Sequence, residues 1–291
     1  MLLLIKYTLL YGIVLMLVAL GGMFSEHSGI INIALEGIMV IGGVAGVLTL
    51  TMLPASLPAF ATVLIAVLVA ALAGMVYSLL LAFASINLKA DQTIGGTALN
   101  LMAPALVLFL IRIIANQNTL QMLTGDAASW FMIKKSTLGI DKNTDLGFFG
   151  ETFVNKVYLA TYVCILLFII LSILLYKTRF GLRLRACGEH PQAADSVGIN
   201  VYKMRYAGVL LSGALGAIGG LAYIVPPVQT WNFEVGVAGA GFLALAVMIF
   251  GQWKPFNICG AAMFFAVFKS LANIADSTLS LIHISEPTRL A

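Results

Sequence analysis

Apolar runs of about membrane-spanning length follow one another along the chain, separated by short polar stretches. A helix needs roughly 20 apolar residues to cross the hydrocarbon core of a bilayer. The eight candidate runs are Tyr7–Met23, Gly29–Leu53, Leu57–Ile86, Gln92–Ile111, Lys156–Tyr176, Tyr206–Val225, the shorter Val235–Phe250, and Asn257–Asn273. Hydrophobic residues make up 61% of the chain and charged residues 10%, against roughly 45–50% and about 25% in ordinary chains. The sequence therefore predicts an all-α fold, a polytopic transmembrane helical bundle with about eight membrane segments.

The loop Tyr176–Arg205 sets the expected orientation of this bundle. It holds six Lys and Arg residues against Glu189 and Asp195, and short loops rich in Lys and Arg remain in the cytoplasm. Counting spans outward from this loop places residues 87–91 inside. The same count places residues 116–155 and the N-terminus outside.

Within the basic loop, Glu189–Val197 is predicted to form a short helix. Pro191 suits the first helical turn, where its missing N–H costs nothing, and Gly198 suits the position just beyond a helix end. Two interpretations remain open. The helix is either a solvated connector lying against anionic lipid or a docking element for a cytoplasmic partner.

The second apolar run carries two polar residues, Asn32 and Glu36. They are four residues apart, so a continuous helix would place them on one face, which Gly43 continues. A carboxylate facing lipid costs about 3 kcal/mol or more, so we expect Glu36 to face the bundle interior or a wet cavity. The alternative is a Glu that reaches interfacial water at the end of the span, or that is paired for structural reasons.

The fourth run begins with Thr93, Thr97 and Asn100 on one helix face. A polar stripe on an apolar helix could line a pathway for solute. The alternative is that the threonines bond to their own backbone and the Asn makes one interhelical bond, which is the commoner arrangement. The seventh run, Val235–Phe250, is short and Gly-rich, which suits a half-helix or a helix buried in protein.

The composition argues against several classes of protein. The chain has no HExxH, paired CxxC or GxxxxGK[ST] motif, and Cys164, Cys187 and Cys259 are scattered along it. We therefore expect no metal, no cofactor, no P-loop for ATP and no enzymatic activity of its own. The net charge of +4 does not indicate a nucleic-acid partner, because the cations lie in loops beside membrane spans.

The last residues, 279–291, depart from the pattern of the preceding chain. Their sequence, LSLIHISEPTRLA, resembles the translation of a transposase-end sequencing adapter. We expect this segment to be an artefact with little packing, the transmembrane domain to comprise residues 1–278, and the natural sequence to continue differently.

Three stretches together resemble one family: SGIINIALEGIMVIGGVAG at Ser28–Gly46, DQTIGGTALNL at Asp91–Leu101, and the segment Arg185–Tyr223 beginning RACGEHPQAADSVGI. They resemble the membrane permeases of ATP-binding-cassette (ABC) importers in the branched-chain amino acid and ribose group, closest to the branch that transports nucleosides with basic membrane lipoproteins as receptors. The similarity extends over nearly all of Leu9–Asn273. The adapter-like end and a missing final helix depart from it.

The resemblance implies a type II ABC importer-like fold in the plasma membrane of a prokaryote. It implies three partners besides membrane lipids: a cytoplasmic ABC ATPase, a second and homologous permease subunit, and an extracytoplasmic solute-binding lipoprotein. It implies no nucleic-acid partner. The candidate pathway residues are Asn32, Glu36, Thr93, Thr97 and Asn100. The resemblance also implies that one segment contacts the ATPase and couples it to transport. This segment contains Arg185, Gly188, Glu189, Pro191, Ala193, Ala194 and Gly198.

Two further functions remain as alternatives to a nucleoside permease. One is an ABC permease for branched-chain amino acids or a pentose. The other is an ion-coupled secondary transporter, although such a protein is expected to carry intramembrane carboxylates in matched repeats, and Glu36 has no evident counterpart in the sequence.

Overall fold

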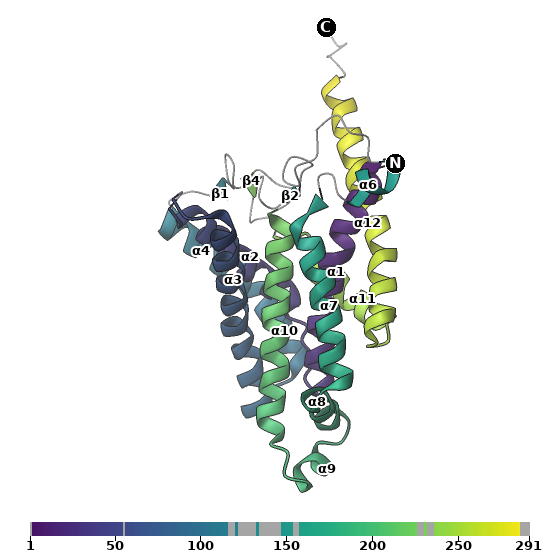
Figure 1. Ribbon diagram of the computed structural model, residues 1–291. Helices are drawn as coiled ribbons and strands as arrows, with labels where there is room; N and C mark the ends of the chain where they lie inside the picture. The colour runs from purple at the N-terminus through teal and green to yellow at the C-terminus, as the bar shows by residue number, and fades with distance from the viewer. Residues whose placement is uncertain are drawn as a thin grey trace.

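The computed structural model describes residues 2–54, 56–115, 120–121, 132–133, 147–153, 157–225, 230–231 and 236–285. Its long helices stand side by side as one bundle (Figure 1). The helices are α1 (Leu2–His27), α2 (Leu35–Met52), α3 (Ala59–Ala82), the π-helical turn η1 (Phe83–Asn87), α4 (Gln92–Ala115), α6 (Gly147–Phe153), α7 (Leu159–Lys177), α8 (Arg179–Glu189), α9 (Pro191–Ser196), α10 (Val201–Ile224), α11 (Ala240–Phe250) and α12 (Pro255–Ser285).

Short strands pair at one end of the bundle. Strand β1 (Leu120–Gln121) pairs antiparallel with β4 (Thr230–Trp231), and β2 (Met132–Ile133) pairs antiparallel with β3 (Val157–Tyr158). Within the described ranges, seven helices are long and apolar enough to cross a membrane, and α11 is a shorter apolar helix. The prediction of about eight membrane segments, one of them short, is therefore confirmed.

The two ends of the bundle differ in what they carry. Helices α8 and α9 of the basic loop lie at one end, and the N-terminus and the short strands lie at the other (Figure 1). Tyr206, near the start of α10, donates a 2.6 Å hydrogen bond to Asn87 Oδ1 at the end of η1. The connection after α3 thus lies at the basic end, and the arrangement agrees with the expected alternation of loops.

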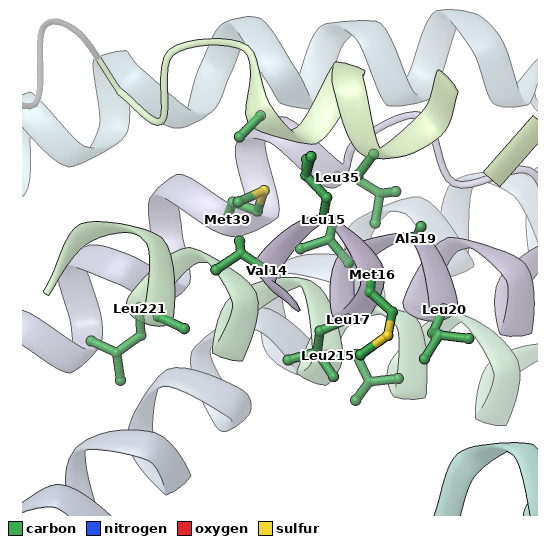
Figure 2. Packing of buried hydrophobic residues seen from close by; sticks show 14 of the residues in the cluster. Val14, Leu15, Met16, Leu17, Ala19, Leu20, Leu35, Met39, Leu215 and Leu221 are labelled. Atoms are coloured by element: carbon green, nitrogen blue, oxygen red, sulfur yellow. The ribbon is translucent and has the colours of Figure 1, made fainter. Parts of the chain in front are cut away.

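Helix α1 lies at the centre of the bundle. Its side chains from Leu10 to Phe24 are almost all buried, and they pack against α2, α10, α11 and α12. Figure 2 shows Val14, Leu15 and Leu17 of α1 among the side chains of α2 and α10. By contrast, α3, α4, α7 and α12 leave most of their apolar surface exposed, as helices that face lipid or another subunit do.

Glycines allow α10 to approach its neighbours closely, as the four-residue spacing of small residues along it indicates. A Cβ at Gly220 would lie 2.0 Å from the carbonyl oxygen of Met39 in α2. A Cβ at Gly213 would lie 2.6 Å from the carbonyl oxygen of Gly74 in α3. Backbone therefore meets backbone at both contacts, which fixes the positions of α2 and α3 on α10.

The backbone of α12 continues through residues 279–285. The side chains from residue 276 onward lie outside the described part of the structure, and so do residues 286–291. The expected lack of packing of this tail therefore stays a prediction.

Candidate translocation site and coupling region

The second span starts as a helix later than the sequence predicts. Residues 28–34 are not helical, and α2 begins only at Leu35. Asn32 therefore does not share a helix face with Glu36, and the expectation of a continuous helix through both was wrong. The Asn32 side chain instead bonds locally, because its Oδ1 accepts a 3.1 Å hydrogen bond from the Ala34 N–H.

The start of α2 lies at about half the depth of the bundle. The Asn32 Nδ2 donates a 2.8 Å hydrogen bond to the hydroxyl of Ser212, which is halfway along the 24-residue helix α10. Both side chains are fully buried. Non-helical backbone at this depth is tolerated only where protein satisfies its polar groups, so the polar side chains around it have a structural reason to be there.

Asn100 of α4 satisfies the backbone at this helix start. Its Oδ1 accepts a 2.8 Å hydrogen bond from the N–H of Gly37, and its Nδ2 donates a 2.8 Å hydrogen bond to the carbonyl of Ile33. The residue at the N-cap position, Ala34, has no side chain able to do this. A side chain from another span thus caps α2.

Glu36 connects α2 to the half-helix α11. Its carboxylate accepts hydrogen bonds from the N–H groups of Gly239, at 2.9 Å, and Gly241, at 2.6 Å. These N–H groups lie at the N-terminus of α11, where free N–H groups and the helix dipole favour an anion. A Cβ at Gly241 would lie 2.4 Å from the Glu36 Cα, so the two helix starts are in direct contact.

Lys269 of α12 completes this polar centre, and the sequence analysis missed it. Its Nζ donates a 3.4 Å hydrogen bond to the carbonyl of Ala238, and it lies close enough to Glu36 to interact with its charge. Ala238 and Gly239 both have positive φ, 51° and 74°. A lone Lys inside the run Asn257–Asn273 was the available signal, since an intramembrane cation is expected to have a specific partner.

Thr93 and Thr97 do not join this centre. Both side chains are exposed, and the Thr97 hydroxyl donates a 2.7 Å hydrogen bond to the carbonyl of Thr93 in its own helix. Asn100, one turn further on, is 7% exposed and makes the interhelical bonds described above. For Thr97 and Asn100 the geometry matches the alternative in which the threonine bonds its own backbone and the Asn links helices.

The predicted short helix within Glu189–Val197 is present as α9, but it is shorter and comprises only Pro191–Ser196. Glu189 is instead the last residue of α8, and the non-helical residue His190 lies between the two helices. The bend follows from Pro191, which disfavours helical conformation in the residue before it.

The end of α9 follows the prediction. Gly198 has a φ of 81°, and its N–H donates to the carbonyl of Asp195 while the N–H of Ile199 donates to that of Ala194. This pair of bonds is a Schellman motif, which a left-handed residue closes. Ala193 is exposed on α9, whereas Ala194 is buried.

Helix α8 is packed firmly against the bundle. A Cβ at Gly188 would lie 2.4 Å from the carbonyl oxygen of His27, at the end of α1. Arg185, one turn earlier, has its guanidinium 5.0 Å from the centre of the Tyr176 ring. Burial raises the pKa of the neighbouring Cys187 thiol, although Arg205 opposes that effect. Burial therefore disfavours the reactive thiolate form of Cys187.

Half-helices and helix breaks that meet inside a multi-pass bundle are typical of transport proteins, and this class is what the fold and the polar centre define. The comparison with known families is specific. Residues 4–284 match the model described as branched-chain amino acid transport system / permease component. The chain belongs to this permease family.

Curated relatives cover most of the chain. It is 40% identical over 269 residues to the guanosine ABC transporter permease protein NupQ of Bacillus subtilis, a match that covers 92% of this chain and 81% of NupQ. It is 41% identical over 265 residues to the nucleoside ABC transporter permease protein NupC of Lactococcus lactis, covering 91% and 80%. A shorter match joins it to NupB of the same strain, a nucleoside ABC transporter permease protein, with 28% identity over 108 residues, or 37% of this chain and 30% of NupB. No solved structure matches the chain.

Proposed function

We propose that this chain is the membrane-spanning permease subunit of an ATP-driven importer, and that the importer carries nucleosides across the plasma membrane of a prokaryote. The observation that carries the proposal is its similarity, at about 40% identity over more than nine tenths of the chain, to two permeases whose names state guanosine or nucleoside transport. The polar centre around Glu36 supports a transport role, because charged groups at membrane depth mark solute pathways.

The importer needs further subunits, which we infer from the same comparisons. Two permease proteins of one Lactococcus lactis strain, NupC and NupB, both resemble this chain. We therefore expect the second permease to be a homologous but different chain. A cytoplasmic ATPase would dock on α8 and α9 at the basic end, and a solute-binding lipoprotein would dock at the opposite end.

Uptake of radiolabelled guanosine and uridine by cells that express the complete set of subunits tests the function. We expect uptake that unlabelled nucleosides compete away and that a Walker-A lysine variant of the ATPase abolishes. Uptake of leucine or ribose with none of any nucleoside would contradict the proposed solute. Uptake that survives loss of the ATPase and disappears with the ion gradient would instead indicate a secondary transporter.

A further inference from the structure

Helix α11 is held at both of its ends by residues of the first two helices. With 11 residues, it is about 16 Å long, or roughly half the thickness of the hydrocarbon core. Its first turn is hydrogen-bonded to Glu36 in the polar centre, and its last turn leads to Gly251, near the basic end of the bundle. It is thus a short rigid rod between the middle of the membrane and the cytoplasmic face.

The cytoplasmic end of α11 is anchored to the end of α1. The Trp253 indole N–H donates a hydrogen bond to the carboxylate of Glu26, and the His27 Nε2 lies 3.3 Å from the carbonyl oxygen of Trp253. Gln252 and Trp253 have φ values of 50° and 53°. Two consecutive residues other than Gly in this conformation persist only where surrounding contacts hold them, and Glu26 and His27 supply such contacts.

The same end of α1 also touches α8. The close approach of Gly188 to the His27 carbonyl leaves no room for a side chain between them. Rigid contacts therefore run without a break from α8, through Glu26 and His27, to Trp253. From there the rod α11 continues to Glu36 and to Lys269.

We propose that Trp253 and Lys269 are positioning residues for transport, which hold α11 as a strut that conveys movement of α8 to the polar centre around Glu36. Trp253 fixes the cytoplasmic end of the strut to α1. Lys269 fixes the opposite end through the Ala238 carbonyl, and the Glu36 carboxylate binds the first N–H groups of the helix. This inference rests on the proposed function, because α11 can transmit force in this way only if the protein is part of an ATP-driven importer.

The test compares solute transported with ATP hydrolysed, in proteoliposomes that contain the complete importer and its receptor. Trp253→Phe keeps a ring but loses the indole N–H, and Glu26→Leu loses the acceptor. We expect each to lower the amount of solute per ATP by at least about fivefold, the low end of ordinary coupling free energies, while ATP hydrolysis continues. Glu26→Gln keeps an acceptor oxygen and should retain the wild-type ratio.

Combining Glu26→Leu with Trp253→Phe should lower the ratio no further than either change alone, because both remove the same bond. Phe256→Leu, at a side chain 77% exposed in the same region, is the matched control and should behave as wild type. A purely structural role would lower uptake and ATP hydrolysis together, in proportion to the amount of assembled complex. That result, or an unchanged ratio in both single variants, would overturn the proposal.

The opposite end of the strut supplies a second test if the Trp253 variants do not assemble. Lys269→Met removes the bond to the Ala238 carbonyl and should also lower the amount of solute per ATP, whereas a wild-type ratio would overturn the role of Lys269. The ratio is measured with whichever solute the wild-type importer carries. If the proposed solute is wrong, the wild-type importer will not transport nucleosides. If the proposed strut is wrong, the wild type will transport its solute normally and the variants will keep the wild-type ratio.

Discussion

At the scale of single residues, polar side chains inside the bundle form hydrogen bonds with backbone groups. Asn32, Glu36 and Asn100 each accept a hydrogen bond from a backbone N–H at or just before the start of a helix. Buried backbone groups without partners are rare, because each costs free energy comparable to a lost hydrogen bond. The broken helices thus depend on these three residues whether or not solute touches them.

Asn100→Leu tests this dependence. The change leaves the Gly37 N–H and the Ile33 carbonyl without partners in a buried place, and each unsatisfied group costs about 1–3 kcal/mol. We expect a clearly lower melting temperature for the purified permease in detergent. Thr97→Val, at an exposed residue whose hydroxyl bonds only its own helix, should stay within about 0.5 kcal/mol of wild type. Equal melting of the two variants would show that Asn100 is dispensable to the fold.

Only part of this site could be predicted from residue patterns in the sequence. Pro191 and Gly198 have local effects on the backbone, so they marked the start and end of α9 correctly. The non-helical stretch before α2 has no such mark, because its apolar residues continue the run and its polar groups are satisfied by Ser212 and Asn100, far away in the sequence. Glu36 was recognisable as an intramembrane acid, but its partner α11 was not.

At the scale of helices, close backbone contact determines the packing of α10. Gly220→Ala would place a methyl group 2.0 Å from the Met39 carbonyl oxygen, so α2 and α10 must separate. Overpacking of this kind costs typically about 1–3 kcal/mol, and we expect reduced thermal stability and less assembled protein. Gly260→Ala, where a Cβ would meet nothing within 4 Å, is the control and should be neutral or slightly stabilising.

Helix α9 offers a sharp test of coupling because its two alanines differ in burial. Ala193→Arg adds a bulky charge on the exposed face and should preserve the fold, yet abolish solute-stimulated ATP hydrolysis by the assembled importer. Ala194 is 3% exposed, so Ala194→Arg is expected to disrupt the turn itself and is not informative. Ala90→Arg, at an exposed residue in the connection after η1, serves as the control at the same end. Normal coupling in Ala193→Arg would make α9 a connector rather than a docking element.

At the scale of the whole molecule, the charges of one loop predict the orientation in the membrane. A cysteine at Ser196, on α9, should be shielded from a membrane-impermeant maleimide added to intact cells. A cysteine at Ser56, in the turn between α2 and α3 at the opposite end, should react. The native Cys164 and Cys187 are buried, but Cys259 is partly exposed, so both variants are made in a Cys259→Ser background. Labelling at Ser196 but not at Ser56 would reverse the topology.

The number and order of the spans could be predicted from the sequence because each long apolar run becomes a helix in lipid for lack of any other way to satisfy its backbone. The relations between spans could not, since they depend on where small residues face one another and on single pairs such as Lys269 with Ala238. These contacts join parts of the chain that have no common sequence pattern.

The central place of α1 has a consequence for how the protein is made. In its most apolar 18-residue stretch, 89% of α1 is buried, against 22% for α7 and α12. Yet α1 is synthesised before α10, α11 and α12, the helices that cover it. Helices of membrane proteins insert before they associate, so α1 must remain in the bilayer, or beside the insertion machinery, without these partners until α10 has been translated. Ribosome stalling at successive lengths should therefore leave α1 open to cross-linking by lipid probes until α10 has entered the membrane.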